Sequence, residues 1–347
     1  MILFSIVIVC IVSVSLIGCT ITGSPTGESI KTSTKAEVQP KLVSSPSEVN
    51  IGVILSNNTD DFEKRLIESM NKESQELGPK VTFAFNESNP DKNVECAQDL
   101  IVNKKVNVLI VDSPTKESFD KILDLAWKNG VYLFNTETLK EIDRLDLVIQ
   151  YVGSDNSEGG YKVGSKTGQL ISSEFGGKAD LIILDMPQEK VKYKERANSF
   201  LLGIQQYARE AKVVLRTNGS ESIEEVQKMV EDLLNQYPDV NVIFSVTKES
   251  TVGALLAAEK LGKDPANFMI TGYDATKEIF ESIRDGGFVR AVVVDQPDEI
   301  AHRMLIIAID LMNGNKTLEV EQAQRQWILT ALVTKDNVND WLSKSND

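Results

Sequence analysis

The sequence predicts an α/β protein made of two lobes, each built on a parallel sheet that helices cover. Its 347 residues exceed what one hydrophobic core ordinarily covers. Short β-branched runs alternate with amphipathic stretches of helical length, at a period of roughly 25 to 30 residues, which indicates repeated βα units. The strand-like runs are continuously apolar, as expected for parallel strands buried on both faces.

The composition is that of an acidic globular protein. Hydrophobic residues make up 41% of the chain and charged residues 25%, so sizeable cores are expected. The net charge of -14 argues against a nucleic-acid partner, because such a partner requires clustered Lys and Arg to replace phosphate counterions. The acidity itself indicates a soluble surface.

The N-terminal segment differs in kind from the rest of the chain. Residues 1–17 form an apolar run relieved only by serines, which predicts an export signal or a membrane anchor. The run is slightly shorter than the roughly 20 residues of a spanning helix. No Lys or Arg precedes Lys31, although a secretory signal normally opens with positive charge. An uncleaved membrane helix and a start upstream of Met1 therefore stay open as alternatives.

The apolar run closes at Leu16-Ile17-Gly18-Cys19, which resembles the lipobox of bacterial lipoproteins. The resemblance implies a signal segment over residues 1–19 and a lipid on Cys19. The acyl chains would hold the protein to the outer face of a bacterial membrane by hydrophobic transfer. In either interpretation the rest of the chain lies outside the cytoplasm.

Residues 20–48 are rich in Ser, Thr, Pro and Lys and show little hydrophobic periodicity, so they predict a flexible tether. Of the three cysteines, Cys10 and Cys19 lie in the N-terminal segment, which leaves only Cys96 in the folded part. An internal disulfide is therefore excluded there, and Cys96 is expected to pack as a small apolar residue.

Ten strands are expected, at residues 51–55, 81–85, 106–111, 131–134, 147–152, 179–184, 212–215, 240–246, 268–271 and 289–294. The helices between them carry apolar residues at three- and four-residue spacing, for example Leu66, Met70 and Leu77, and these stripes predict core packing. Trp127 and Trp341 are also interpreted as packing residues.

The residues that follow these strands are unusually polar. In open parallel sheets a ligand binds at the carboxyl ends of the strands, so these positions are candidates for a site. Helix N-caps and turns favour the same residue types, which is the alternative explanation for each of them. They are Ser56 to Asp61, Asp112-Ser113, Asn135-Thr136-Glu137, Asp185, Thr217-Asn218, Thr247-Lys248-Glu249, Asp274 and Asp295-Gln296.

Several motifs, in their order and spacing, resemble the ribose-type (type 1) periplasmic sugar-binding proteins. The motifs are Gly153-Ser154-Asp155-Asn156 with Gly159-Gly160, Lys194-Glu195-Arg196 before Phe200, Thr271-Gly272-Tyr273-Asp274, and Asp295-Gln296-Pro297. The resemblance covers about residues 49–342. It implies two Rossmann-like three-layer lobes joined by a multi-strand hinge. The first lobe would comprise residues 49–152 plus about 296–325, and the second residues 153–295 plus about 326–345.

Two of these motifs are expected to serve the structure. Ser154-Asp155-Asn156 is interpreted as the cap of the helix that enters the second lobe, since Ser, Asp and Asn accept hydrogen bonds from free N–H groups at a helix start. Gly159 and Gly160 are expected to permit close helix packing near the hinge.

The resemblance also implies a ligand site. It assigns ligand contacts to Asp60, Phe62, Asn135, Thr136, Arg196, Thr247, Asp274 and Asp295. Arg196 would donate hydrogen bonds to sugar hydroxyls or a ring oxygen, and Asp274 would accept from hydroxyls. A planar guanidinium donor beside a carboxylate acceptor suits polyols, because each hydroxyl both donates and accepts hydrogen bonds. The alternatives are a surface charge for Arg196 and a helix cap for Asp274.

The site departs from the family pattern at several positions. Asn135 stands where sugar binders commonly carry Asp, and Thr136 where Arg is frequent. Thr247 replaces a usual Asn or Asp, and Asp295 replaces a common Gln or Asn. Phe62 matches a stacking position, whereas Glu63 stands where a second aromatic is usual. A polar but altered pocket is expected, and the carboxylates Asp60, Glu63 and Asp295 leave an amine-bearing ligand open.

The expected function is capture of a small polar ligand, a monosaccharide, and its presentation to the permease of an ABC transporter. The alternative is a sensor subunit that signals through a membrane histidine kinase or chemoreceptor. An enzyme is not expected, because the single histidine, His302, lies on an amphipathic helix and no nucleophile elbow, phosphate loop or metal-ligand spacing occurs. No cofactor, metal or nucleic acid is expected.

Overall fold

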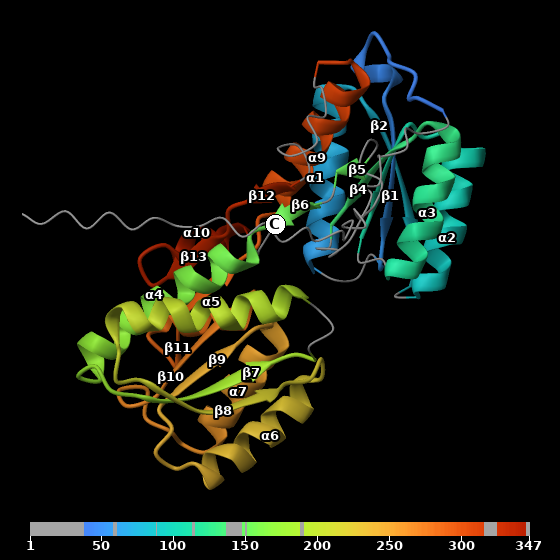
Figure 1. Ribbon diagram of the computed structural model, residues 1–347. Coiled ribbons are helices and arrows are strands. Elements are labelled where there is room, and N and C mark those ends of the chain that lie inside the picture. The colour runs from blue at the N-terminus through green and yellow to red at the C-terminus, as the bar shows by residue number, and fades with distance from the viewer. Residues whose placement is uncertain are drawn as a thin grey trace, which may run out of the picture. The chain divides into compact units, whose positions relative to one another are not determined.

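The computed structural model describes residues 38–57, 61–87, 89–112, 115–136, 148–149, 151–187, 191–315 and 325–344. A first lobe contains a five-stranded sheet in the order β2-β1-β3-β4-β5, with all pairs parallel (Figure 1). The strands are β1 (Asn50–Leu55), β2 (Lys80–Phe85), β3 (Val108–Val111), β4 (Tyr132–Asn135) and β5 (Val148–Ile149).

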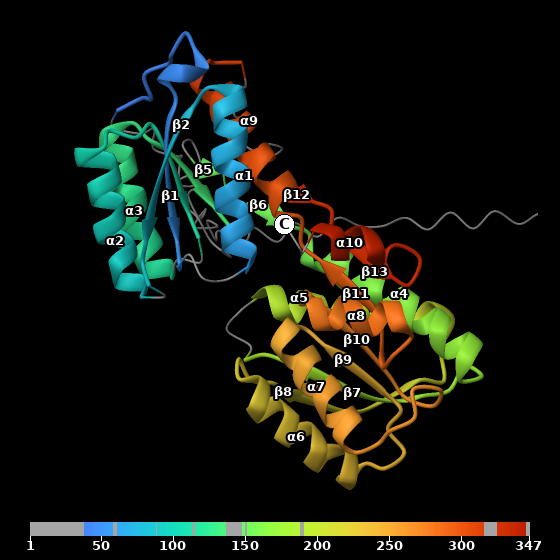
Figure 2. The ribbon, with the colours of Figure 1, turned by 180° about the vertical axis from the view of Figure 1, so that it is seen from behind.

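Helices cover both faces of the first sheet, as Figures 1 and 2 show from opposite sides. The helices are α1 (Asp61–Leu77), α2 (Pro90–Gln98) with a π-helical turn (Asp99–Asn103), α3 (Lys116–Asn129) and α9 (Pro297–Met312). Successive residues of a strand point to opposite faces. Accordingly, Val53 packs with the α1 and α9 side chains, whereas Ile54 packs with those of α2 and α3.

The segment before β1 contacts the first lobe. The N–H of Val38 donates to the carbonyl of Trp127 at 3.4 Å, and the N–H of Val43 donates to the carbonyl of Met312 at 2.8 Å. A short 3₁₀ turn (Pro46–Glu48) then leads into β1. Residues 38–48, which the sequence assigns to the tether, are thus bonded to the ends of α3 and α9.

A second lobe contains a six-stranded sheet in the order β13-β11-β10-β9-β7-β8. Its strands are β7 (Asp180–Asp185), β8 (Lys212–Asn218), β9 (Val242–Ser245), β10 (Met269–Tyr273), β11 (Val289–Val294) and β13 (Ala331–Thr334). The pairs are parallel except for β13, which runs antiparallel to β11 at the edge. The helices are α4 (Asn156–Glu174), α5 (Val191–Tyr207), α6 (Ile223–Gln236), α7 (Lys248–Lys260), α8 (Lys277–Asp285) and α10 (Val338–Lys344).

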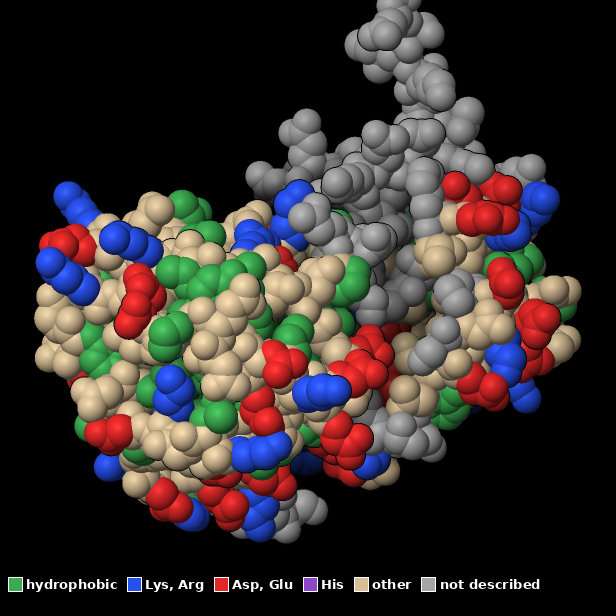
Figure 3. All heavy atoms as spheres, turned by 90° about the horizontal axis from the view of Figure 1, so that it is seen from below, with side chains coloured by type: hydrophobic (Ala, Val, Ile, Leu, Met, Phe, Trp, Pro, Cys, Tyr) green, Lys and Arg blue, Asp and Glu red, His purple; other side chains and the backbone are tan. Residues whose placement is uncertain are grey.

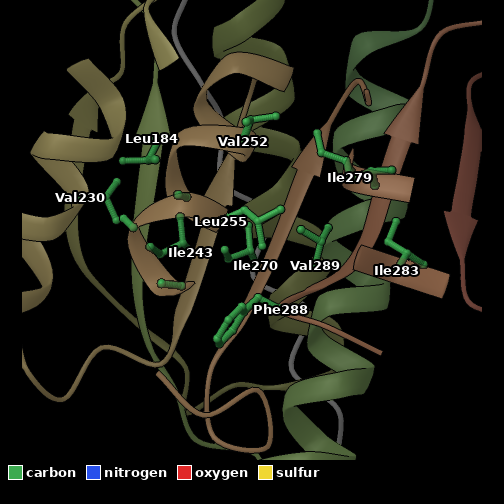
Figure 4. Packing of buried hydrophobic residues seen from close by; sticks show 14 of the residues in the cluster. Leu184, Val230, Ile243, Val252, Leu255, Ile270, Ile279, Ile283, Phe288 and Val289 are labelled. Atoms are coloured by element: carbon green, nitrogen blue, oxygen red, sulfur yellow. The ribbon is translucent and has the colours of Figure 1, made fainter. Parts of the chain in front are cut away.

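The second sheet also separates two apolar layers. Ile182 and Ile243 face α6, α7 and α8, in the core that Figure 4 shows with Val230, Leu255 and Ile283. The alternate strand residues face α4 and α5 in the other layer. Both lobes are therefore three-layer units, as expected, and none of the helices in the ranges given above is long and apolar enough to cross a membrane.

The chain passes between the lobes beside a two-stranded parallel pair, β6 (Tyr151–Ser154) and β12 (Arg325–Ile328). It enters the second lobe after β6, returns between β11 and α9, and crosses again between β12 and β13. The N–H of Asp155 donates to the carbonyl of Ile328 at 2.9 Å. The amide of Gln296 donates to the carbonyl of Leu329 at 2.6 Å, so the crossings are tied to one another.

Helices α4 and α5 pack closely because glycines face the contact. A Cβ on Gly160 would lie 2.3 Å from the carbonyl oxygen of Arg196, which is nearer than atoms can approach. A Cβ on Gly159 would lie 2.5 Å from the hydroxyl of Tyr273. The close helix packing predicted for this pair is confirmed at Gly160, which lies against the start of α5, whereas Gly159 packs against Tyr273 of β10.

Candidate functional site

A buried arginine lies at the carboxyl edge of the second sheet. Arg196 comes from α5, and its side chain is 4% exposed. Its Nη1 donates to Asp274 Oδ2 at 2.9 Å, and its Nη2 donates to Asp295 Oδ2 at 3.3 Å. Asp274 follows β10 and Asp295 follows β11, so the parallel order of the strands brings these two carboxylates to one guanidinium. Three of the residues predicted for the site are thus in direct contact.

The guanidinium is held by further contacts within the same lobe. Its Nε donates to Asn156 Oδ1 at 2.8 Å, and Nη1 also donates to the carbonyl of Val246 at 3.0 Å. Its central carbon lies 3.5 Å from the centroid of the Tyr273 ring, a cation–π contact that favours the charged group inside the protein. The Tyr273 hydroxyl donates to Asp295 Oδ1 at 3.4 Å. Contacts within the protein therefore fix the orientation of Arg196.

Asp274 sits on an unusual backbone. Its φ of 64° lies in the left-handed region, which residues with a Cβ seldom occupy and which is often found at functional sites. The N–H of Asp274 donates to the carbonyl of Val293 at 2.7 Å, which holds the residue beside β11. This conformation places the carboxylate against Arg196.

The charges of this cluster shift one another's protonation. Burial is the main cause that raises the pKa of Asp274 to about 6, and the neighbouring charge of Asp295 adds to it, whereas Arg196 opposes both. Burial alone would lower the pKa of Arg196, but Asp274, Tyr273 and Asp295 together raise it above its usual value. Burial, followed by Asp295, also raises the pKa of Tyr273. Arg196 is thus charged at any physiological pH.

The first lobe contributes its own polar residues at the carboxyl edge of its sheet. Asn135 is the last residue of β4 and is fully buried. Thr136 follows it, and its hydroxyl donates to the carboxylate of Asp112, the residue after β3. Phe62 lies at the start of α1 and packs partly buried against the apolar layer that includes α9.

Glu63 has a different role from the one that its charge suggests. Glu63 is 7% exposed, and its carboxylate accepts from the N–H groups of Ser56 and Asn57, each at 2.9 Å. Glu63 therefore holds the loop that follows β1, and this contact, rather than an amine-bearing ligand, accounts for its burial.

Thr247 serves as the N-cap of α7. Its hydroxyl oxygen accepts from the N–H of Ser250 at 3.2 Å, and its carbonyl accepts from that of Thr251. It follows Val246, whose carbonyl binds Arg196, so the cap and the arginine are neighbours along one loop. Cys19 and Asp60 lie outside the described residues.

Two residues of the cluster were not in the predicted site. The sequence assigns Asn156 to a helix cap, but it is Asp155 that caps α4, by accepting from the N–H of Glu158 at 2.9 Å. Asn156 is instead free to accept from Arg196. Tyr273 directly precedes Asp274, which is the signal that could have placed it in the site.

Other site chemistries find no support in the described ranges. There, no group of three or more His, Cys, Asp or Glu side chains could hold a metal ion. On the face shown in Figure 3, acidic and basic side chains are interspersed around apolar patches. The chemistry of the Arg196 cluster is that of hydrogen bonding: a charged donor fork beside two acceptors.

Comparisons with known proteins agree with this architecture. The ribose import binding protein RbsB of Salmonella typhimurium is 24% identical over 266 residues, which cover 77% of this chain and 86% of that protein. RbsB of Bacillus subtilis is 24% identical over 280 residues, covering 80% of this chain and 86% of the relative.

A solved ABC transporter solute-binding protein from Bacillus halodurans with bound myo-inositol has a TM-score of 0.70 at 21% identity, covering 87% of this chain and 99% of that one. The expected type 1 periplasmic binding protein fold is thereby confirmed. The relatives are binding proteins, in line with the interpretation that this chain is not an enzyme. The family model described as "Periplasmic binding protein domain" matches residues 51–316, most of the chain, and the chain belongs to this family.

Proposed function

We propose that this chain is an extracytoplasmic solute-binding protein that captures a monosaccharide or a related polyol and presents it to an ABC transporter. The observation that carries the proposal is the buried, pre-oriented Arg196 with Asp274 and Asp295 at the carboxyl edge of the second sheet. Sugar hydroxyls both donate and accept, so a guanidinium beside carboxylates suits them.

The names of the relatives support a sugar-like ligand. The curated relatives are import binding proteins for ribose, and a further one, from Paraburkholderia graminis, is for D-apiose. The similar structure from Bacillus halodurans holds myo-inositol, a ring of hydroxyls. These ligands share closely spaced hydroxyls on a compact ring, which is the chemistry that the Arg196 cluster recognises.

Ligand capture would work by a shift of conformational population. A ligand that contacts Arg196 and Asp274 in the second lobe, and Asn135, Thr136 and Phe62 in the first, stabilises a closed state by its differential affinity for that state. The crossings after β6, before α9 and after β12 would serve as the hinge. A membrane permease would then bind the closed form.

The N-terminal segment would attach the protein to the membrane. The proposal is that Cys19 carries a lipid after cleavage of residues 1–18. Metabolic labelling with radioactive palmitate tests it: the wild-type chain should incorporate label, and Cys19→Ala should not. Equal labelling of both would contradict lipidation at Cys19, and the matched control is Cys96→Ala, which should label as the wild type does.

The ligand class is tested by thermal shift of the full-length chain in detergent against pentoses, hexoses, inositols and nucleosides. A ligand that binds only the native state raises the melting temperature as its concentration rises. A selective hit among sugars or inositols supports the proposal, and no shift across the panel contradicts it. Uptake of the hit by cells, lost on deletion of the gene, would favour transport over the sensing alternative.

A further inference from the structure

The second-lobe cluster has few donors left for a ligand. Within the described residues, the contacts of Arg196 use the Nε proton, both Nη1 protons and one Nη2 proton. A guanidinium carries five N–H donors, so one remains. Four of the five N–H donors of Arg196 thus bind other groups of the protein, and one is left for ligand oxygens.

Acceptors remain in excess at the same place. Asp274 accepts from Arg196 through Oδ2, which leaves Oδ1 without a partner among the described residues. Asp295 accepts from Arg196 and, at the long distance of 3.4 Å, from the Tyr273 hydroxyl. The Asp274 side chain is 31% exposed and the Asp295 side chain 16%, so both are reachable. Each carboxylate oxygen accepts about two hydrogen bonds, so Asp274 and Asp295 have unused acceptor capacity. A ligand that donates hydrogen bonds would fill it.

The formal charges point the same way. Arg196 contributes one positive charge, and Asp274 and Asp295 contribute two negative ones. Lys192 also acts on Asp274, but it is the weakest of the influences on that carboxylate, and its Nζ lies 5.5 Å from the centroid of the Tyr193 ring. The hydrogen-bonded cluster therefore holds an excess of one negative charge at a largely buried place, where charge interactions are stronger than in water.

We infer that this site selects a ligand carrying a protonated amine, an amino or imino sugar, and that Asp295 is the residue that sets this selectivity. The inference rests on the proposed function and narrows its ligand class. An ammonium brings up to three donors and the missing positive charge, whereas a neutral hydroxyl brings one donor and no charge. A phosphorylated or carboxylated sugar would be repelled by the carboxylates of Asp274 and Asp295, because it carries the same sign of charge.

The protonation of Asp274 is consistent with this selectivity. Burial and then, after the opposing effect of Arg196, the charge of Asp295 raise the pKa of Asp274 to about 6. One arginine thus does not fully stabilise two carboxylates, and a bound cation would relieve them. The selectivity for an amine is expected to fall as the pH drops below about 6, because Asp274 then takes up a proton.

The test is isothermal titration of the full-length chain in detergent with matched probes. The pairs are D-glucosamine with D-glucose, D-galactosamine with D-galactose, and 1,4-dideoxy-1,4-imino-D-ribitol with D-ribose. N-acetyl-D-glucosamine controls for the size of the nitrogen substituent without its charge. At neutral pH at least one amine probe should bind tenfold or more tightly than its neutral partner, and added salt should reduce that ratio.

Asp295→Asn keeps the side-chain shape and removes the charge, so it should cut the amine-to-neutral ratio about tenfold. The matched control is Glu210→Gln, which removes one charge from a surface pair with Lys178 in the same lobe, where Glu210 is 69% exposed. The ratio of amine affinity to neutral-sugar affinity is measured within one variant. A smaller fraction of folded protein lowers both affinities equally and leaves the ratio unchanged. The wild-type ratio stands as a test even if Asp295→Asn does not fold.

The outcomes separate this inference from the proposed function. If neutral sugars bind and their amine partners bind no better, the amine selectivity is wrong and the sugar-binding function stands. If amines are preferred equally in wild type and Asp295→Asn, the role of Asp295 is overturned. If no probe of either kind binds, both proposals fail.

Discussion

The guanidinium carbon of Arg196 lies 3.5 Å from the centroid of the Tyr273 ring. The aromatic face supports the arginine from one side while Asn156, Asp274 and Asp295 bind its edges. Its orientation therefore depends on packing and on hydrogen bonds together, and substitutions of the ring and of the carboxylates would affect binding separately.

Arg196→Ala should weaken ligand binding by roughly 2 to 4 kcal/mol, because the two carboxylates lose the partner that holds them in position and the ligand loses the one remaining Nη2 donor. Asp274→Ala should have an effect of similar size. Titration of the ligand found by thermal shift measures both. The control is Arg284→Ala, a surface arginine paired with Asp285 and 42% exposed, which should bind as the wild type does. Wild-type affinity in Arg196→Ala would remove this cluster from the site.

Tyr273→Phe and Tyr273→Leu should differ. Phenylalanine keeps the aromatic face and loses only the long bond to Asp295, so its affinity should stay within about threefold of the wild type. Leucine loses the cation–π contact with a buried guanidinium, which is worth about 1 to 2 kcal/mol. Titration with the same ligand distinguishes the two substitutions. Equal losses in both variants would assign the effect to the hydroxyl instead of the ring.

The stability of the ligand-free protein should carry a pH signature from Asp274. Its folded pKa of about 6 lies above its ordinary value of 3.8, chiefly because of burial. The folded state therefore binds the proton more tightly than the unfolded state does. The resulting stabilisation is fully present below pH 3.8 and is lost as the pH rises through about 6.

The measurement is denaturant unfolding of wild type and Asp274→Asn from pH 4 to pH 8. Titrating groups outside the Arg196 cluster are common to both proteins, so the difference between the two curves reports Asp274 and its effect on the charged groups beside it. The stability of the wild type relative to the variant should fall between about pH 4 and pH 7. A difference that rises with pH would contradict the raised pKa of Asp274.

Gly160→Ala should loosen α4 from α5 and shift Arg196. The added methyl group would lie 2.3 Å from the Arg196 carbonyl oxygen, so the helices must separate, at a cost of roughly 1 to 3 kcal/mol in the free energy of unfolding. Ligand affinity should fall as well. Ser172→Ala, on the exposed face of the same helix, is the control and should change neither quantity by much.

The repeated βα pattern predicted the lobes well because apolar runs and helical stripes are local signals. It missed β12 and β13, and it merged β5 with β6. These short strands lie at the crossings or at a sheet edge, where pairing between distant residues, such as Gln326 with Val152, decides the structure. The spacing of apolar residues along the chain gives no information on such long-range strand pairing.

The sequence predicts those site residues whose positions follow from the order of the strands alone. Asp274 and Asp295 meet because the ends of adjacent parallel strands share an edge, and Arg196 was placed by the family resemblance. The role of Asn156 was not predictable, because an asparagine at a helix start resembles any cap. For Tyr273 the signal was its position directly before Asp274, since a buried tyrosine otherwise resembles any core residue. Which way each side chain turns depends on α4, α5 and β10 packing together.

The bonds of Val38 to Trp127 and of Val43 to Met312 attach the segment before β1 to the first lobe and not to the second. From residue 38 onward the incoming chain is bonded to the first lobe, so an attachment at the N-terminus would act on that lobe first. The second lobe, which carries Arg196 and its carboxylates, joins that body through the hinge crossings. In an anchored molecule the first lobe would be the one attached to the membrane segment. The second lobe, with Arg196 and its two carboxylates, would be the one that moves relative to it when the hinge bends.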